Sequence, residues 1–579
     1  MDMVNVKING VDYSVPAGIT VLEACRYAGI DIPTLCYLKD INAIGACRLC
    51  LVEVKGARGL VTACVYPIND GMEIQTNTER IRSVRKTNLE LVLSAHEKKC
   101  LSCIRSTTCE LQKLAQEYKC DEDRFVYGPK AEKKPLDTSS VSIIRDNNKC
   151  ILCRRCVAAC NKLQGIGAIG AVNRGFDSEI GCAFERDLAE TSCINCGQCV
   201  VACPVGALYE KDDTQKVLDA IADPTKHVAI CTAPSVRATI GECFGNAPGT
   251  DVEGKMVAAI KRLGFNGVYN MNLTADLTIM EEAHEFLGRF TKGEKLPLIT
   301  SCSHGWVKFC EHYYPEFTDN ISSCKSPQQM FGATYKTYFA EKNGLDPKDI
   351  FFVSVIPCTA KKFEVQRDHQ NAAGVPDVDV AITTRELAKM IEKAGIDFMN
   401  LPDEEFDSPF EIGSGAGAIF GATGGVMEAA LRTAAATLGV KLDSLELDDV
   451  RGTEGIKKAT YKLGEHTVRV AVVSGTINAK KILEAIKAGE EKIDFLEVMA
   501  CPGGCVNGGG QPTQPMSLRN YTDLKAIRAK VLYDADRNLP IRESHKNPEV
   551  LALYKEFFGE PGSEKAHHIL HTEYVKRGH

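Results

Sequence analysis

The sequence lacks the features that would point to nucleic acid, a membrane or secretion. Lysine and arginine total 69 against 76 aspartate and glutamate residues, and the net charge of -7 leaves no basic excess for nucleic acid. No run of about 18 apolar residues occurs, so no membrane-spanning helix is predicted. The N-terminal stretch MDMVNVKING lacks the charged-then-apolar layout of a secretory signal. We therefore expect a cytoplasmic protein with no nucleic-acid partner and no membrane partner.

Cysteine, by contrast, is abundant. Disulfides are rare in a reducing compartment, so 26 cysteines in 579 residues indicate metal sites. A chain of this length predicts roughly three to five domains. Most of the cysteines are clustered, and the scattered ones are expected to be small buried side chains. The scattered cysteines are Cys25, Cys120, Cys182, Cys231, Cys243, Cys310 and Cys324.

Residues 1–80 predict a β-grasp-like domain with a [2Fe-2S] cluster. Two runs that alternate apolar and polar residues flank Asn9-Gly10, which is typical of a β-hairpin. A short amphipathic helix is expected over 20–28. Four thiolates with the spacing C-x10-C-x2-C-x13-C then supply the ligands that such a cluster needs. The long first gap resembles the ferredoxin-like domain of respiratory NADH dehydrogenase and hydrogenase subunits. The four ligands are Cys36, Cys47, Cys50 and Cys64.

Residues 81–125 are helical in pattern and contain the set His96-x3-Cys100-x2-Cys103-x5-Cys109. One histidine and three cysteines can hold a [4Fe-4S] cluster, and the same set is a legitimate zinc site. A third possibility is that His96 is only a helix-surface residue. The position between two other iron–sulfur units favours the cluster. The Lys/Pro-rich stretch 127–137 predicts a linker.

Residues 140–212 contain an internal repeat, C-x2-C-x2-C-x3-C, that is typical of bacterial two-cluster ferredoxins. In that arrangement the fourth cysteine of each run serves the other cluster. The second run is followed by Pro204, whereas the first has Asn161 in place of proline. One [4Fe-4S] cluster is predicted on Cys150, Cys153, Cys156 and Cys203, and its partner on Cys193, Cys196, Cys199 and Cys160.

Residues 213–515 alternate short apolar runs with helical stretches, which predicts an α/β catalytic domain of two parallel-sheet lobes. Ligands of such folds bind beyond the carboxyl ends of strands. Cys302, Cys358 and Cys501 each closely follow an apolar run. The preceding clusters therefore read as a path for single electrons, and this domain as the reaction centre.

Four segments carry a resemblance to a known family: TAPSVR at 232–237, TSCSHGW at 300–306, IPCTAKKFE at 356–364 and EVMACPGGCVNGGGQP at 497–512. They resemble the active-site loops of [FeFe]-hydrogenases. The order of domains is similar to the clostridial monomeric type and to catalytic subunits of NAD(P)-linked, electron-bifurcating hydrogenases. Residues 516–579, with LYKEFFGEPGSEKAHHILHTEYVKR, resemble the small subunit of the family as a fused tail.

The resemblance implies an H-cluster, in which a [4Fe-4S] cubane shares a cysteine sulfur with a diiron unit that carries CO, cyanide and a dithiolate bridge. Cys358, Cys501 and Cys505 correspond to cubane ligands, and Cys505 to the bridging one. Lys361 corresponds to the lysine that donates to a cyanide ligand. The glycines of 503–510 are expected to let the backbone approach the cofactor. Residues that correspond to the wall around the diiron unit are Ala233, Pro234, Ser235, Gln328, Phe420 and Met499. Ile356 stands where the family usually has methionine.

Proton transfer to a buried metal needs a chain of exchangeable groups. Glu282 and Glu285 share one face of a predicted helix, being three residues apart. By resemblance they are the relay carboxylates, with Ser322 between them. From the residues alone, a solvated acidic face is the competing interpretation.

The first loop departs from the family pattern Thr-Ser-Cys-Cys-Pro-x-Trp, because Ser303 and His304 replace the second cysteine and the proline. On alignment Cys302 is the proton-carrying thiol and Ser303 occupies the fourth cubane position. Serine is a far poorer iron ligand than a thiolate. Three outcomes are open: a Ser303 alkoxide ligand, a shift that makes Cys302 the ligand, or an imidazole ligand from His304. The preference of iron–sulfur clusters for thiolate favours the Cys302 shift.

The resemblance thus predicts reversible oxidation of H2 to protons and electrons in an anaerobic organism. The expected cofactors are one [2Fe-2S], three [4Fe-4S] and the H-cluster, which separate maturation proteins would supply. Expected partners are ferredoxin, or NAD(P)-linked flavoprotein and iron–sulfur subunits. A hydrogen sensor, an impaired homologue or an iron–sulfur assembly factor is the alternative that the altered loop raises. A pure electron-transfer subunit is a third, which the paired glutamates oppose.

Overall fold

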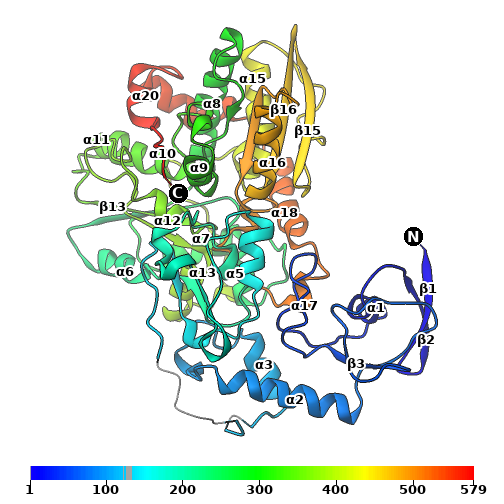
Figure 1. Cartoon of the computed structure of the whole chain (residues 1–579). Coiled ribbons are helices and arrows are strands. Elements are labelled where there is room, and N and C mark those ends of the chain that lie inside the picture. The colour runs from blue at the N-terminus through cyan, green and yellow to red at the C-terminus, as the bar shows by residue number, and fades with distance from the viewer. Residues whose placement is uncertain (1, 122, 126–132, 579) are drawn as a thin grey trace.

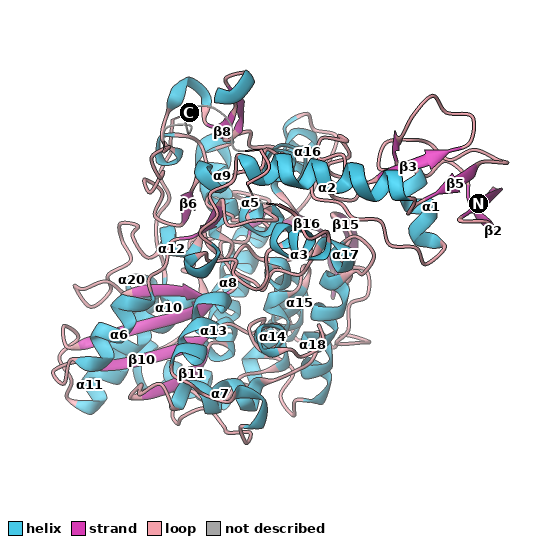
Figure 2. Ribbon diagram, turned by 90° about the horizontal axis from the view of Figure 1, so that it is seen from below, coloured by secondary structure: helices cyan, strands magenta, loops and turns pink. Residues whose placement is uncertain are grey.

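The computed structural model describes residues 2–121, 123–125 and 133–578. Residues 127–132 of the expected linker therefore lie outside the described residues. The N-terminal sheet stands to one side of the main body, and helix α2 (Glu79–Ser94) runs between the two (Figures 1 and 2). Among the described helices none is long and apolar enough to cross a membrane.

The N-terminal region is a five-stranded sheet in the order β2-β1-β5-β3-β4. Strands β1 (Met3–Ile8) and β2 (Val11–Pro16) form the expected hairpin, in which Asn9 and Gly10 adopt φ values of 53° and 87°. Both turn residues need positive φ in the tight turn that suits twisted strands. β1 runs parallel to β5 (Glu73–Gln75), while β3 (Leu51–Val54) and β4 (Val61–Thr62) are antiparallel. Helix α1 (Val21–Tyr27), capped by Thr20, completes the β-grasp-like arrangement.

The ferredoxin-like region keeps its repeat at the level of the backbone. Helices α4 (Arg155–Ala158) and α5 (Gln198–Ala202) each begin inside a cysteine run. Within the runs Leu152 and Asn195 have φ values of 54° and 56° at equivalent positions, and Arg154 and Gly197 have 58° and 70°. These left-handed residues turn the chain between successive cysteines in both halves. The paired strands are β6 (Ile143–Arg145) with β9 (Leu208–Glu210), and β7 (Gly170–Val172) with β8 (Glu179–Gly181).

The first catalytic lobe has the expected parallel sheet, in the order β11-β10-β13-β14. Its strands are β10 (His227–Thr232), β11 (Gly267–Asn270), β13 (Ile350–Ile356) and β14 (Val380–Thr383). Both faces are covered by helices, as parallel sheets require (Figure 2). The carboxyl ends of these strands therefore open on one edge, where the active-site loops begin.

The second lobe corrects the expectation of two parallel sheets. Its order is β12-β17-β16-β15, and β15 (Ile456–Leu463) pairs antiparallel with β16 (His466–Ser474). Only Gly464 and Glu465 separate these strands, and a two-residue connection can join antiparallel strands only. β12 (Leu298–Ile299) and β17 (Phe495–Met499) follow the parallel rule. The sequence interpretation did not include β15 as a strand.

Helix α8 (Asn272–Lys292) joins the two lobes. Leu273 and Leu277 belong to the core of the first lobe, whereas Ala275, Ile279 and Phe286 belong to that of the second. The remaining helices of this region are α6 (Thr214–Ala222), α7 (Glu253–Lys261), α9 (His304–Tyr313), α10 (Pro327–Thr334), α11 (Ala340–Asn343), α12 (Lys361–Glu364), α13 (Thr384–Lys393), α14 (Gly415–Ala418), α15 (Gly425–Thr437) and α16 (Thr476–Lys487). The tail contributes α17 (Met516–Arg519), α18 (Leu524–Asn538), α19 (Pro548–Leu553) and α20 (Glu564–Leu570), and small α3 (Glu110–Glu117) follows α2.

Candidate active site

Two cavities in the ferredoxin-like region each gather four thiols. One is lined by Cys150, Cys153, Cys156 and Cys203. The other is lined by Cys160, Cys193, Cys196 and Cys199. These are the crossed sets that the sequence predicts. In the first cavity the backbone N–H of Leu152 donates to Cys150 Sγ at 3.4 Å, a contact of the kind that stabilises cluster-bound sulfur.

The four N-terminal thiols also meet. Hydrogen bonds from Cys47 and Cys64 lower the pKa of Cys36, and one from Cys64 lowers that of Cys50, so the four sulfurs lie within reach of one another. The N–H of Leu35 donates to Cys47 Sγ at 3.5 Å. This set fits a [2Fe-2S] cluster bound by four thiolates.

His96 is oriented as a metal-ligating histidine would be. Its Nδ1–H donates to the carbonyl oxygen of Lys149 at 3.0 Å, which leaves Nε2 as the available ligand atom. Burial lowers the pKa of His96, so the ring is neutral and able to bind a metal. The helix-surface interpretation of His96 is therefore not supported. A neutral imidazole in this orientation suits zinc and a [4Fe-4S] cluster alike.

Two contacts bring the N-terminal sites to the first ferredoxin cavity. Asn42 Nδ2 donates to the carbonyl oxygens of both Cys36, at 2.8 Å, and Cys153, at 3.1 Å. Arg105, next to Cys103, donates to the carbonyl oxygen of Cys203 at 3.3 Å. The [2Fe-2S] site and the His96 site thus approach the same cavity from two directions.

Three thiols from two loops converge at the edge of the catalytic lobes. Cys358 follows β13, and Cys501 and Cys505 follow β17. Burial raises the pKa of Cys501, and the charges of Cys358 and Cys505 raise it further, which places the three side by side. Burial likewise raises the pKa of Cys505 to about 12. Buried thiols in such a group are suited to a metal, which removes their protons outright.

This group adjoins the second ferredoxin cavity. The charge of Cys501 raises the pKa of Cys196 after the larger effect of burial. Thr359 Oγ1 donates to the carbonyl oxygen of Asn195 at 2.6 Å, beside Cys196. A Cβ on Gly509 would lie 2.2 Å from the carbonyl oxygen of Cys196. Only glycine allows this approach of the third loop to the ferredoxin-like region.

The other glycines of that loop serve the same kind of packing. A Cβ on Gly508 would meet the carbonyl oxygen of Pro357 at 2.2 Å, and one on Gly510 would meet Thr383 at 2.7 Å. Gly503 and Gly504 have φ values of 83° and 93°, which favour glycine. These contacts with protein account for the glycine run in addition to the approach to a cofactor that the sequence predicts.

Residues 302–304 of the first loop each have a different partner. Burial raises the pKa of Cys302, and the charges of Glu282 and Cys505 add to it, so Cys302 lies between the carboxylate and the thiol group. Ser303 is the N-cap residue of α9, and its Oγ accepts the N–H of Ala500 at 3.0 Å. His304 Nδ1 lies 2.9 Å from Glu364 Oε1.

Glu364 is the centre of a buried polar group that sequence reasoning missed. Its carboxylate contacts Lys361 Nζ at 2.7 Å and Gln328 Nε2 at 2.7 Å, besides His304. The charge of Lys361 helps to hold the pKa of Glu364 low against the effect of burial, and burial lowers the pKa of His304 to about 4. His304 is therefore a neutral ring beside an ionised carboxylate, and among the described residues neither of its nitrogens has a hydrogen-bond partner. The "FE" that ends IPCTAKKFE was the available signal.

Lys361 lies among the thiols as well as beside Glu364, since its charge opposes the pKa increase of Cys302, Cys358 and Cys505 that burial causes. Phe420 and Met499 are buried in one cluster that Cys302 and Cys505 pack against. Gln328 has two buried partners. Its Nε2 donates to Glu364, and its Oε1 accepts a hydrogen bond from Ser354 Oγ at 2.8 Å. Ala233, Pro234 and Ser235 follow the end of β10, and Ser235 Oγ accepts from Gln511 at 3.4 Å.

Glu282, Ser322 and Glu285 form a connected row from Cys302 outward. Burial raises the pKa of Glu282 to about 8, the charge of Glu285 adds to this effect, and a hydrogen bond from Ser322 opposes it. Ser322 Oγ donates to Glu285 Oε2 at 2.8 Å, and Arg289 lies one helical turn from Glu285 and binds it at 2.5 Å. Among the described residues Glu282 Oε1 has no hydrogen-bond partner. A solvated acidic face is excluded for Glu282, which is 1% exposed.

The described residues thus fit most of the groups that the resemblance implies: four-thiol sets for three clusters, and three thiols with Ser303 beside Lys361 for the H-cluster. Of the His/Cys3 set, His96 is oriented as a ligand, and the charge of Cys103 adds to the effect of burial in raising the pKa of Cys109, so these two thiols are close. The chain also matches profiles of known families. The matches are "Iron only hydrogenase large subunit, C-terminal domain" at 226–509, "Iron hydrogenase small subunit" at 522–577, "2Fe-2S iron-sulfur cluster binding domain" at 1–79, "NADH-ubiquinone oxidoreductase-G iron-sulfur binding region" at 85–124 and "NADH-quinone oxidoreductase subunit 3, ferredoxin-like domain" at 140–209.

Relatives extend over the whole chain. NADP-reducing hydrogenase subunit HndD of Solidesulfovibrio fructosivorans is 48% identical over 590 residues, covering 100% of both chains. Iron hydrogenase 1 of Clostridium pasteurianum is 45% identical over 577 residues, covering 99% of this chain and 100% of its own. A solved [FeFe]-hydrogenase structure, HydA(deltaEFG), superimposes with a TM-score of 0.56 at 41% identity, covering 63% of this chain and 99% of that one.

Proposed function

We infer the roles of individual residues from one premise: the chain belongs to the iron-only, or [FeFe], hydrogenases. It is an oxidoreductase that oxidises H2 and relays the electrons through iron–sulfur clusters. The proposed roles rest on one observation: the groups suited to electron transfer and the groups suited to proton transfer meet at Cys302. Three buried thiols beside the second ferredoxin cavity lie next to Cys302, and Cys302 lies next to the row that begins at Glu282.

We propose that electrons pass along five sites. Cys358, Cys501 and Cys505 would hold the cubane of the H-cluster, with Cys505 as the bridge to the diiron unit. When bound, this group supplies the redox chemistry of H2. The cavity lined by Cys196 adjoins it, and the cavity lined by Cys153 follows. The [2Fe-2S] site and the His96 site, taken as a [4Fe-4S] site, then offer two alternative outer ends of the path. The count of one [2Fe-2S] and three [4Fe-4S] clusters is part of this proposal.

Protons are proposed to move through Cys302, Glu282, Ser322 and Glu285 in that order. The raised pKa of Glu282, about 8, suits a group that must both take up and release a proton near neutral pH. Its unpartnered Oε1 is available for a hydrogen bond toward Cys302. Arg289, held by Glu285, marks the outer end of the row.

Lys361 is proposed to donate to an anionic ligand of the diiron unit, while Ala233, Pro234, Ser235, Gln328, Phe420 and Met499 enclose that unit. Glu364 holds Lys361 in place, and neutral His304 shares the same carboxylate. An ammonium group with three donors suits a buried anion. The Nδ1 atom of His304 lies against this carboxylate, while its buried Nε2 has no hydrogen-bond partner among the described residues.

For the fourth cubane position we propose Ser303 and not a shifted Cys302. Cys302 lies beside Glu282, which supports its role as the proton-carrying thiol. Ser303 Oγ lies at the N–H of Ala500, the residue before Cys501, and its own proton remains free to leave on metal binding. Alkoxide ligation is weaker than thiolate ligation, so this cubane should be the most labile of the set.

The electron partners are proposed to be NAD(P)-linked flavoprotein and iron–sulfur subunits, or ferredoxin. The relative HndD is an NADP-reducing hydrogenase subunit by name, and two N-terminal matches are to NADH dehydrogenase regions. We keep the domain boundaries 1–80, 81–125, 140–212, 213–515 and 516–579 as part of the proposal. A sensor or assembly role is not favoured, because the full-length relatives are hydrogenases.

The test is infrared spectroscopy of protein matured under anaerobic conditions, together with H2 uptake coupled to an electron acceptor. CO and cyanide bands with H2 uptake are expected. Intact ferredoxin clusters without those bands and without uptake would mean that this chain is an impaired homologue. Uptake that persists in Cys302→Ala would instead contradict only the proposed proton path.

A further inference from the structure

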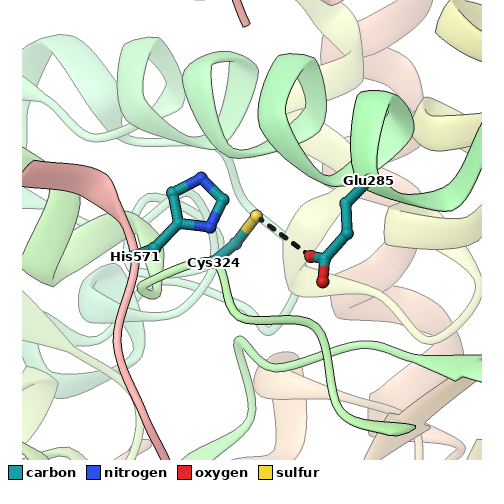
Figure 3. Close-up of side chains that lie close together, drawn as sticks. All are labelled: Glu285, Cys324 and His571. Carbon is teal, nitrogen blue, oxygen red and sulfur yellow. Dashed lines mark hydrogen bonds between the residues drawn. The ribbon is translucent and has the colours of Figure 1, made fainter. Parts of the chain in front are cut away.

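Three side chains from distant parts of the chain meet beside α8, outside the thiol group of the active site. Glu285 comes from α8, Cys324 precedes α10, and His571 follows α20 in the tail (Figure 3). A carboxylate oxygen, a sulfur and a ring nitrogen lie within 4.8 Å of one another. We propose that Glu285, Cys324 and His571 bind a thiophilic divalent cation of the zinc class, and that this binding stops proton transfer through Glu285.

The donor set is the one that zinc prefers. Cysteine sulfur, histidine nitrogen and a carboxylate oxygen are its usual protein ligands, and a water molecule can complete a tetrahedral site. Cys324 is 0% exposed and His571 9% exposed, so the sulfur and the ring are screened from solvent. The side chain of Glu285 keeps 15% of its surface exposed, which offers a way in from the side of Arg289.

The backbone holds two of the ligands in register. Cys324 and His571 form an isolated antiparallel β-bridge, so the tail is fixed against the segment before α10. Neighbouring hydrogen bonds agree with this pairing: Lys325 N–H donates to Leu570 O at 2.8 Å, and Thr572 N–H to Ser323 O at 2.8 Å. The site is thus complete only when the tail is docked.

His571 has the outer contacts that orient metal-binding imidazoles. Its Nδ1 lies 2.8 Å from Ser323 Oγ, and its Nε2 lies 3.1 Å from Glu281 Oε2. Whichever nitrogen binds the metal, the other keeps a partner that fixes the ring. Glu281 is itself held by Tyr554 Oη at 2.5 Å and by the N–H of Gly562 at 2.9 Å.

The local charge also favours a cation. Burial raises the pKa of Cys324, and the charges of Glu285, Glu282 and Glu281 raise it further. Arg289 is the cation that binds Glu285. A divalent ion would offset this negative charge and bind the thiolate. The thiol proton would leave to water, so affinity should increase with pH.

Binding at this site would interrupt the proposed relay. Ser322 Oγ donates to Glu285 Oε2, and Cys324 Sγ is hydrogen-bonded to the same oxygen at 3.8 Å. A carboxylate that coordinates a dication cannot readily take up a proton. This inhibitory consequence depends on the proton path proposed above, whereas the binding itself does not.

The experiment uses mature holoenzyme under anaerobic conditions with added Zn²⁺. Equilibrium dialysis with metal analysis measures binding, X-ray absorption at the zinc edge reports the ligands, and H2 uptake reports inhibition. The test variant is Cys324→Ala, with Cys324→Ser as a second variant in case the first loses iron. The matched control is Cys243→Ala, which removes a scattered thiol that belongs to no such ligand group among the described residues.

We expect wild type and Cys243→Ala to bind zinc with one sulfur ligand and to lose H2 uptake. Cys324→Ala should keep its uptake without zinc and should need at least about tenfold more zinc for inhibition, because loss of one ligand weakens a site at least as much as loss of an outer contact. Equal binding and inhibition in Cys324→Ala would overturn the site. Loss of iron on zinc addition would place the zinc at the clusters and would also overturn it. Binding with one sulfur but with normal uptake would overturn the inhibitory role alone.

If no H2 uptake is measured in any variant, dialysis and X-ray absorption still decide the binding proposal. Failure of the proposed function and failure of this site are therefore distinguishable. The pH dependence gives a further arm: zinc affinity that does not increase between pH 6 and pH 8 would oppose a thiolate ligand.

Discussion

The side of the catalytic pocket that faces the ferredoxin-like region differs in kind from the side that faces α8. Toward the ferredoxin cavity the groups are thiols and close backbone, as at Cys501, Cys196 and Gly509. Toward α8 they are exchangeable groups in a row, Glu282, Ser322 and Glu285. Electrons need short distances between clusters, whereas protons need a chain of donors and acceptors. Cys302 lies where the two sides meet.

Because the two sides use different groups, substitutions on them should have different effects. A thiol ligand lost on the electron side removes a cluster and its iron. A carboxylate lost on the proton side should leave every cluster in place and stop only the turnover. Iron content and turnover, measured on the same preparation, therefore separate the two sides.

The largest effect on H2 turnover is expected from Glu282→Gln. Glutamine keeps the shape of the side chain but cannot carry a proton, so H2 turnover should fall by about 10²–10⁴-fold. Iron content and the reduced-cluster spectra should match those of wild type. Glu281→Gln is the matched control, because the neighbouring carboxylate is bound to Tyr554 and Gly562 and not to the row. A Glu282→Gln enzyme with near-normal turnover would place the proton path elsewhere.

Cys302→Ala tests the residue where the sides meet. We expect a loss of turnover of at least about 100-fold, because the first acceptor of the row is removed. Iron content should stay at the wild-type value, since Cys358, Cys501, Cys505 and Ser303 remain. Failure of the cubane to form would be seen as missing iron and a missing spectral component. That result would show that Cys302 is a cubane ligand, as the shift of the first loop predicts.

Ser303→Cys should strengthen the electron side and leave the proton side unchanged. A fourth thiolate replaces a hydroxyl, so loss of iron to a chelator should become at least about tenfold slower. The measurement is the time course of iron release under anaerobic conditions, with Ser301→Cys, two residues away and bonded to Cys324 O at 2.7 Å, as the control. Unchanged release in Ser303→Cys would mean that position 303 does not ligate the cubane.

Sequence was most informative where the ligands are local. The C-x2-C-x2-C-x3-C runs predicted the crossed thiol sets, because the cysteines of each run lie within eleven residues of one another, whereas the short helices α4 and α5 were not predicted. The β-grasp hairpin followed from Asn9-Gly10 for the same reason. The antiparallel edge of the second lobe was missed, since β15 is an exposed, lysine-rich strand without a clear apolar run.

The catalytic pocket was predictable only through its resemblance to a family. Its groups come from loops spread along the chain from Ala233 to Cys505, and their meeting depends on the packing of two lobes about α8. Glu364 and His571 illustrate the limit. Glu364 stands three residues after Lys361 on one helix, but only the fold brings it to His304, and only the fold brings His571 to Ser323.

The smallest expected effect concerns pH and the hydrogen bond of Ser322. Glu282 has its pKa raised from 4.5 to about 8, so it donates protons below about pH 8 and accepts them above it. H2 evolution should therefore fall as the pH rises through about 8, and H2 oxidation should increase. The same shift favours the folded state fully below pH 4.5, a contribution that is lost as the pH rises through about 8.

Because the bond from Ser322 lowers this pKa, Ser322→Ala should move the inflection to higher pH by less than about one unit, besides reducing the rate. The measurement is the position of the inflection and not its height, with Ser323→Ala as the control. An inflection near pH 4.5 in wild type, or one that moves to lower pH in Ser322→Ala, would show that Glu282 does not govern proton delivery.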